Sequence, residues 1–263
     1  MAERGSEMQS NPVRDKLGRG ETALGIMAFE FFSPGLPQVL AAAGAEFCIF
    51  DMEHSGVGIE TIKQQVAASR GVGLVPMVRV PGSHYHLIAP VLDAGAMGIM
   101  VPMVETRAQA ERIAAWCRYR PAGIRGLAFN LAHDDYRGGD VEAKMARAND
   151  RTLVIALIET KTGIDNADAI LSVPGIDVGW LGHFDLTNSL GITGQFDHPD
   201  FIGAVDRFLA ACERHGKAAG FLAGSLAIAD AWLKRGIRCL CYGTDVMVFQ
   251  EALATALTAL RDR

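Results

Sequence analysis

Residues 152–159 read Thr-Leu-Val-Ile-Ala-Leu-Ile-Glu, a continuous apolar run that ends in an acid. A strand covered on both faces carries a run of this kind, whereas a half-exposed strand alternates apolar and polar residues. The run therefore predicts a fully buried strand with a carboxylate at its carboxyl end.

Seven similar runs occur elsewhere in the chain, and helical stretches lie between most of them. The other predicted strands are Thr22–Phe29, Glu46–Glu53, Leu74–Val80, Gly98–Val104, Ile176–Gly182, Ala218–Ala223 and Arg238–Gly243. The predicted helices between them are Leu36–Ala43, Ile59–Ser69, His86–Ala94, Arg107–Arg118, Phe201–His215 and Ser225–Arg235. Strand–helix alternation predicts a parallel sheet with right-handed crossovers.

Eight such units in 263 residues favour an α/β fold of the (β/α)8, or TIM-barrel, type, which typically needs about 250 residues. A doubly wound open sheet is the alternative, although no glycine-rich phosphate loop follows the first predicted strand. We expect residues 1–20 to be a mobile arm and residues 21–263 to form one barrel domain. Residues 248–260 form an amphipathic helix that would pack on the barrel or on another subunit, and the long polar stretch 119–149 would be functional or interfacial.

Composition excludes several classes of protein. The net charge of −5 gives no reason to expect nucleic acid. No secretory signal is visible, and no apolar stretch reaches the ~20 residues that a membrane helix needs. The five cysteines are odd in number and scattered, which favours a reducing cytoplasm over a disulfide framework.

Acidic residues follow two predicted strands that are neighbours in the chain. Glu159 ends the fifth strand, and residues 182–184 lead from the sixth strand to Asp185. Active sites of parallel barrels lie at the carboxyl ends of the strands, and adjacent strands are only about 4.8 Å apart. The two carboxylates could therefore share one Mg²⁺, which commonly takes one or two carboxylates and completes its shell with water and substrate. Alternatively, each acid caps the N-terminus of a helix.

Three further residues at this end of the barrel are candidates for chemistry. Arg79 ends the third strand, and its buried guanidinium needs an anion, either a substrate carboxylate or Asp51 or Glu53 across the rim. His54 is a candidate general base because its reference pKa is about 6.5, or it is a polar loop residue. Asp93 lies in the last turn of a helix, where the helix dipole disfavours an acid. We expect a partner for it, and His54 is one candidate.

Six motifs appear in one order along the chain. They are Phe50-Asp51-Met52-Glu53-His54, the run 74–79 ending in Arg79, Leu92-Asp93-Ala94-Gly95-Ala96 with the following 101–104, the run 120–126, Ile158-Glu159-Thr160, and the run 182–186 around Asp185. Together they resemble the HpcH/HpaI aldolases, class II pyruvate aldolases that include 4-hydroxy-2-oxoheptanedioate and 2-dehydro-3-deoxyglucarate aldolases. The resemblance extends from about Gly20 to the C-terminus.

This resemblance implies a homo-hexameric (β/α)8 barrel, a dimer of trimers, with the C-terminal helix swapped between subunits. It implies a divalent metal (Mg²⁺, Mn²⁺ or Co²⁺) held by Glu159 and Asp185 and chelated by the carboxylate and oxo oxygens of a 2-oxo acid such as pyruvate. His54 would act as acid and base, Asp93 would raise its basicity, and Arg79 would stabilise the enolate. The implied reaction cleaves a 4-hydroxy-2-oxo acid to pyruvate and an aldehyde. No Schiff-base lysine is expected, and the predicted strands contain no lysine.

The chain departs from the family pattern at two positions. Leu157 stands where the family often has glutamine, and Gly182-His183-Phe184-Asp185 replaces a common Gly-Pro-Ala-Asp. We expect Leu157, Gly182 and Phe184 to line the substrate pocket, with one donor fewer and more bulk than usual. We interpret His183 as a turn residue.

Two other functions stay open as alternatives. One is a metal-dependent decarboxylase or an acyl-CoA lyase of the same superfamily, although no basic surface for the diphosphate of CoA stands out in the sequence. The other is a ligand-binding protein without catalysis. The presence of Glu159, Asp185, Arg79 and His54 together argues against the second alternative.

Overall fold

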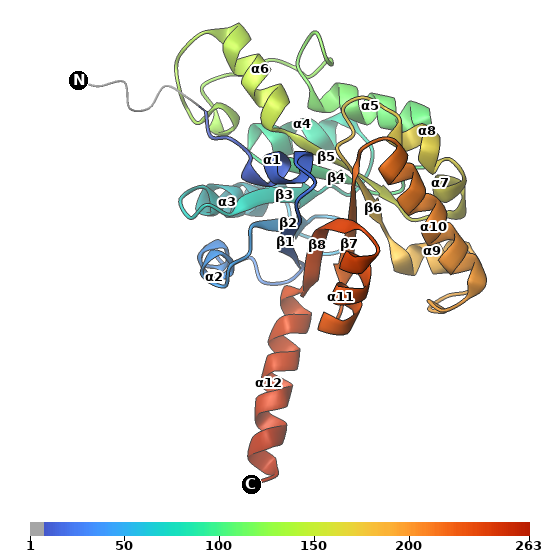
Figure 1. The fold of residues 1–263 in the computed structure, drawn as a ribbon. Helices are drawn as coiled ribbons and strands as arrows, with labels where there is room; N and C mark the ends of the chain where they lie inside the picture. Colours follow the sequence, from blue (N-terminus) through green and yellow to red (C-terminus); the bar gives the residue numbers. More distant parts are fainter. Residues whose placement is uncertain (1–7) are drawn as a thin grey trace.

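Eight parallel strands close into a barrel that helices surround, in a computed structural model that describes residues 8–263 (Figure 1). The strands are β1 (Ala23–Ala28), β2 (Phe47–Asp51), β3 (Val75–Arg79), β4 (Gly98–Val101), β5 (Leu153–Ile158), β6 (Val178–Leu181), β7 (Ala218–Ala223) and β8 (Ile237–Thr244). Each of the eight predicted strands is confirmed, with small shifts at the ends. Pairing of β1 with β8 closes the sheet and rules out the open doubly wound alternative.

Helices lie between the strands along the chain, and α1 precedes the first strand while α12 follows the last. They are α1 (Pro12–Gly18), α2 (Leu36–Ala42), α3 (Ile59–Arg70), α4 (Tyr85–Asp93), α5 (Arg107–Cys117), the 3-10 turn η1 (Ala132–Asp134), α6 (Val141–Arg151), α7 (Lys161–Asp165), α8 (Ala167–Leu171), α9 (His183–Ser189), α10 (Pro199–Arg214), α11 (Leu226–Lys234) and α12 (Asp245–Arg261). All the predicted helices are present. The structure adds η1 and α6 within the long polar stretch, and the short α7, α8 and α9 near the ends of β5 and β6.

The register of the strands decides which side chains share the rim of the barrel. Asp51 at the end of β2 pairs with Arg79 at the end of β3. Ile158 of β5 pairs with Leu181 of β6, so the residues that follow these two strands leave the barrel at the same level. The sequence-predicted acids and the arginine therefore meet at one end.

The barrel interior is packed with side chains and is not a pore. Met77, Met100, Ile155 and Trp180 belong to a buried cluster that fills it, as in other barrels of this type. The Trp180 ring fits only because residue 220 is glycine, since a Cβ there would lie 2.3 Å from the ring. The five cysteines are all buried free thiols, as expected for the strand residues Cys239 and Cys241.

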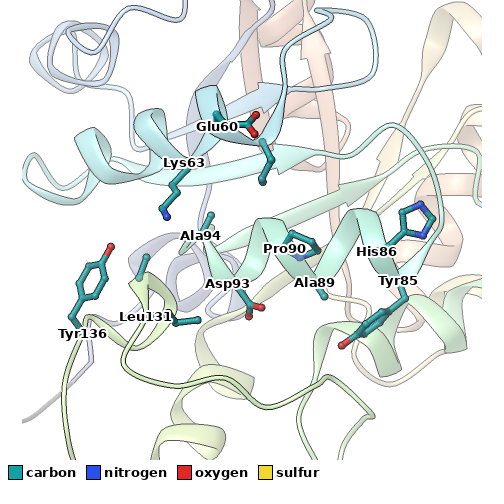
Figure 2. Close-up of a pocket in the computed structure, with 12 residues that line it drawn as sticks. Glu60, Lys63, Tyr85, His86, Ala89, Pro90, Asp93, Ala94, Leu131 and Tyr136 are labelled. Carbon is teal, nitrogen blue, oxygen red and sulfur yellow. The ribbon is translucent and has the colours of Figure 1, made fainter.

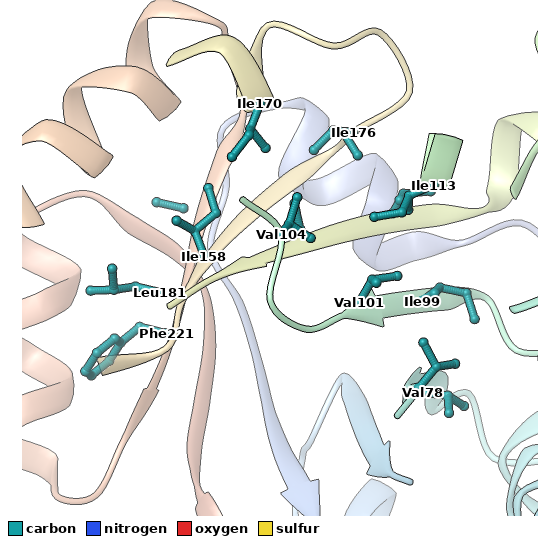
Figure 3. Packing of buried hydrophobic residues seen from close by; sticks show 14 of the residues in the cluster. Val78, Ile99, Val101, Val104, Ile113, Ile158, Ile170, Ile176, Leu181 and Phe221 are labelled. Atoms are coloured by element: carbon teal, nitrogen blue, oxygen red, sulfur yellow. The ribbon is translucent and has the colours of Figure 1, made fainter. Parts of the chain in front are cut away.

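A second apolar layer joins the outer faces of the strands to the helices (Figure 3). Ile99 and Ile158 on the strands belong to the same buried cluster as Ile113 of α5 and Ile170 of α8. Each such side chain contributes roughly 1.5–3 kcal/mol when fully buried. This layer explains why the strands carry apolar residues on both faces.

The expectation of a mobile arm differs from the structure over residues 12–18, which form α1. Val13 and Leu17 lie on one face of this helix, and both belong to the cluster that fills the barrel. The Asn11 side chain donates to the carbonyls of Met97 and Arg151, which precede β4 and β5. Helix α1 therefore closes the amino-terminal end of the barrel, opposite the rim that carries the acids. Residues 1–7 of the predicted arm lie outside the described residues.

Helix α12 extends away from the barrel (Figure 1). Its apolar side chains, among them Phe249, Leu253 and Leu257, are exposed within one chain. Exchange of this helix between subunits stays a prediction. Across residues 8–263, no helix combines the length and hydropathy that a membrane crossing requires.

Removal of the Leu17 side chain tests the role of α1. We expect Leu17→Ala to lower the free energy of unfolding by about 2–4 kcal/mol, because it leaves a cavity at the end of the core. Arg19→Ala is the control, since Arg19 is exposed and pairs only with the surface residue Glu21; it should change stability by less than about 0.5 kcal/mol. Chemical denaturation measures both, and equal effects would show that α1 does not close the core.

Candidate active site

A cavity of about 330 Å³ opens at the carboxyl ends of the strands. It is lined by Met27, Phe29, His54, Arg79, Met100, Leu157, Glu159, Trp180, Leu181, Gly182, His183, Phe184, Asp185, Leu222, Thr244 and Met247. All the sequence-predicted site residues except Asp93 are in this set.

Glu159 is the most deeply buried acid of the cavity, with 4% of its surface exposed. Its Oε1 accepts a hydrogen bond from the backbone N–H of Met103 at 2.8 Å. Burial raises the pKa of Glu159 to about 7, and the charges of Asp185 and Glu53 add to the rise, while the Met103 N–H and Arg79 oppose it. The carboxylate is thus placed where ionisation is costly unless a cation comes close.

Asp185 reaches the same cavity from the first turn of α9. Within the part of the chain that the structure describes, its exposed carboxylate accepts no hydrogen bond. Gly182 allows the two acids to share the cavity, because a Cβ there would lie 2.5 Å from both Cβ and Oε2 of Glu159. The capping alternative does not hold for Glu159, since the N-cap of α7 is the side chain of Thr160.

The donor set of the cavity fits a hard divalent cation. The described residues contain no group of three or more His, Cys, Asp or Glu side chains that could hold a metal. Two carboxylates are nevertheless what Mg²⁺ commonly takes from a protein, with water and substrate supplying the other oxygens. A cation between Glu159 and Asp185 would also offset the repulsion that raises the pKa of Glu159.

Arg79 is held by two acids and still has a free edge. Its Nε lies 2.5 Å from Oδ1 of Asp51, and its Nη1 lies 3.2 Å from Oε2 of Glu53. Its Nη2 is buried and has no hydrogen-bond partner among residues 8–263. Both interpretations of Arg79 therefore have support: the rim acids orient the guanidinium, and Nη2 remains to meet an anion in the cavity.

His54 lies at the mouth of the cavity on the turn after β2. The carboxylate of Asp51 accepts hydrogen bonds from the backbone N–H groups of Glu53 and His54, which fixes this turn. The imidazole Nε2 lies 3.7 Å from Oε2 of Glu53, and 58% of the side chain is exposed. The imidazole is thus positioned beside Glu53, one of the two acids that hold Arg79.

Asp93 does not meet His54 within the chain. It lines a different cavity, of about 720 Å³, between α3, α4 and residues 131–136 (Figure 2). Its Oδ1 pairs with Nη2 of Arg125 at 2.6 Å. Arg125 lies in the motif 120–126, and its permanent positive charge makes it a strong partner for an acid. No interaction between Asp93 and His54 is present among the described residues, and the proposed effect of Asp93 on His54 stays a prediction.

Two polar residues near the site, His183 and Asp245, are engaged in packing or in hydrogen bonds that hold the fold. The imidazole of His183 lies against the rings of Phe184, Phe196 and Phe221, and burial lowers its pKa to about 4. Asp245, another strand-end acid, accepts hydrogen bonds from the backbone N–H groups of residues 29–31 and so joins β1 to β8.

Comparisons with known proteins identify the family of the chain. The sequence profile of the HpcH/HpaI aldolase/citrate lyase family matches residues 29–252. A 2-keto-3-deoxy-L-rhamnonate aldolase of Klebsiella pneumoniae is 35% identical over 252 residues, which cover 96% of this chain and 94% of that protein. The crystal structure of an HpcH/HpaI aldolase/citrate lyase family protein from Burkholderia cenocepacia J2315 is similar, with a TM-score of 0.90, 30% identity and coverage of 96% of this chain and 100% of that chain. The citrate synthase SbnG has a TM-score of 0.85 at 30% identity, with 95% and 97% of the two chains covered. The chain therefore belongs to the HpcH/HpaI aldolase/citrate lyase family and is a lyase.

Proposed function

We propose that the protein is a divalent-metal-dependent aldolase that cleaves a 4-hydroxy-2-oxo acid to pyruvate, or a close 2-oxo acid, and an aldehyde. The observation that supports this most is the arrangement of the cavity. Two carboxylates without a basic partner of their own, Glu159 and Asp185, line it together with Arg79, whose buried Nη2 is unpaired. With a divalent cation between the two carboxylates, such a site would suit a small anion that has several oxygens.

Mg²⁺, Mn²⁺ or Co²⁺ held by Glu159 and Asp185 would withdraw electrons from the 2-oxo group and acidify the neighbouring C–H. Arg79 would donate from Nη2 to the oxygen on which negative charge develops, while Asp51 and Glu53 keep the guanidinium in place. Leu157, Gly182 and Phe184 would bound the space for the substrate.

His54 would carry the proton of the cleavage step. It would accept the proton of the C4 hydroxyl as that oxygen becomes the aldehyde carbonyl, and the electrons of the C3–C4 bond would pass into the enolate of pyruvate. The carboxylate of Glu53, 3.7 Å from the imidazole, would stabilise the protonated form. Protonation of C3 would then complete pyruvate.

An acyl-CoA lyase or a decarboxylase is the second candidate, because one similar structure is a citrate synthase. A CoA substrate brings a diphosphate, which favours several cations. Arg79 is the only arginine or lysine among the residues that line the cavity, and two acids already hold it. The lack of further cations in the cavity favours an uncharged aldehyde over an acyl-CoA as the fragment released together with the 2-oxo acid.

The same proposal includes a homo-hexamer, a dimer of trimers, in the cytoplasm. The exposed apolar face of α12, with Phe249 and Leu257, supports a contact with another subunit. The free cysteines support a reducing compartment.

A screen of 4-hydroxy-2-oxo acids for pyruvate release tests the proposed function. Chelator should abolish release, and Mg²⁺, Mn²⁺ or Co²⁺ should restore it. Asp185→Asn should lower the metal-restored rate by at least about 100-fold, because it removes a charged ligand. Asp197→Asn removes an exposed acid that does not line the cavity and should leave the rate unchanged. Full activity in chelator would contradict the proposal.

Arg79→Lys tests the role of the free guanidinium edge. Lysine keeps the charge near Asp51 and Glu53 but cannot contact both acids and the substrate at once. We expect kcat to fall by roughly 10²–10³-fold with KM much less affected, measured by steady-state kinetics. The matched change Arg107→Lys, in an exposed pair with Glu111, should have no effect. An unchanged kcat for Arg79→Lys would exclude Arg79 from the reaction.

Borohydride reduction in the presence of pyruvate distinguishes this chemistry from a Schiff-base mechanism. No lysine lines the cavity, so intact-mass spectrometry should show no pyruvate adduct. A reduced adduct on any lysine, with loss of activity, would replace the metal mechanism by a covalent one.

A further inference from the structure

The cavity has two chemically different sides. The polar side chains His54, Arg79 and Glu159 come from the ends of β2, β3 and β5, and Asp185 follows at the start of α9. The facing residues are mainly apolar. They are Trp180 and Phe184, from β6 and α9, with Leu222 of β7, Met247 of α12, and Met27 and Phe29 of β1 and the turn after it. We call this second set the apolar wall.

The order of the barrel separates the two sides. Strands β6, β7, β8 and β1 are consecutive in the closed sheet, and so are β2 to β5. The apolar wall therefore lies along one half of the rim and adjoins Glu159 and Asp185 at one end and, through Phe29, Arg79 at the other, while Met100 of β4 and Leu157 of β5 add apolar surface to the opposite half. A 2-oxo acid bound beside Arg79 and the two acids would therefore have the apolar wall within reach of its other substituent.

Phe184 is the most exposed large member of the apolar wall. The residue is 62% exposed, although aromatic neighbours contact its ring. It lies 4.6 Å from the His183 ring and 5.2 Å from the Phe196 ring between centroids. Behind them, Phe221 stacks on Trp232 at 4.1 Å. A supported ring that keeps one face open beside a cavity is suited to cover an apolar group.

Apart from Asp185, the side chains on this half of the rim that can hydrogen-bond are those of Trp180, His183 and Thr244. The hydroxyl of Thr244 already accepts the N–H of Met247 and caps α12. The ring of His183 lies between aromatic rings. A polyhydroxylated chain placed here would lose hydrogen bonds to water without gaining equivalent ones, which disfavours it relative to an alkyl or aryl chain.

We propose that the apolar wall binds the substituent of the aldehyde fragment and selects an alkyl or aryl group over a polyol chain. This inference rests on the proposed function, because it assigns the aldehyde fragment of the same reaction to the apolar wall of the same cavity. In the synthetic direction, C3 of pyruvate loses a proton and bonds to the aldehyde carbon. The aldehyde oxygen takes up a proton and becomes the 4-hydroxyl of the product.

Two aldehydes of the same shape test the selection. In 2-methylbutanal, methyl groups take the places of the two hydroxyls of glyceraldehyde. With pyruvate and Mn²⁺, kcat/KM for wild type should be higher for 2-methylbutanal. The ratio of the two values should fall by about tenfold or more in Phe184→Ser, in Met247→Gln, or in both. Leu226→Gln replaces an exposed leucine outside the cavity and should leave the ratio unchanged.

A wild-type ratio that favours glyceraldehyde, or a ratio that neither cavity substitution changes, would overturn the inference. Exchange of the pyruvate methyl protons with D₂O, followed by NMR without any aldehyde, reports on the proposed function separately. Exchange without the aldehyde preference would overturn the selection alone. Absence of exchange in the metal-supplied wild type would overturn the proposed function, and the selection with it.

Discussion

The burial of the Glu159 carboxylate, close to the negative charges of Asp185 and Glu53, is the constraint on which the site depends. Glu159 is almost fully buried, and Asp185 and Glu53 are close enough to raise its pKa further. Arg79 offsets part of this charge but is itself engaged by Asp51 and Glu53. The arrangement costs free energy in the isolated chain, and a divalent cation is the simplest species that relieves it.

The barrel creates this crowding through register and through one small residue. The pairing of β5 with β6 brings Glu159 and Gly182 to the same level, and Gly182 has no Cβ to separate the acids. On the other side of the rim, Asp51 fixes both the guanidinium of Arg79 and the turn that carries His54. Without Gly182 or without the contacts of Asp51, the other site residues would remain in the sequence but would not be held in this arrangement.

Much of this architecture could be predicted because a fully buried strand has a distinctive pattern. Continuous apolar runs identified all eight strands, and the polar residues that follow them identified His54, Arg79, Glu159 and Asp185 in the cavity. Helix α1 was missed because only Val13 and Leu17 mark its buried face, too few residues to show a period. The partner of Asp93 was missed for another reason. Arg125 lies 32 residues away, in a loop whose path no local pattern determines. The asymmetry of the cavity likewise depends on which strands adjoin in space, and it became visible only in the closed barrel.

Anomalous diffraction from crystals grown with Mn²⁺ and pyruvate would test the central claim most directly. The account predicts one strong peak in the cavity, with oxygens of both Glu159 and Asp185 at coordination distance, about 2.1 Å, and with Nη2 of Arg79 facing the bound acid. A peak coordinated by only one of the two carboxylates, or a cavity that holds pyruvate without any metal peak, would contradict it.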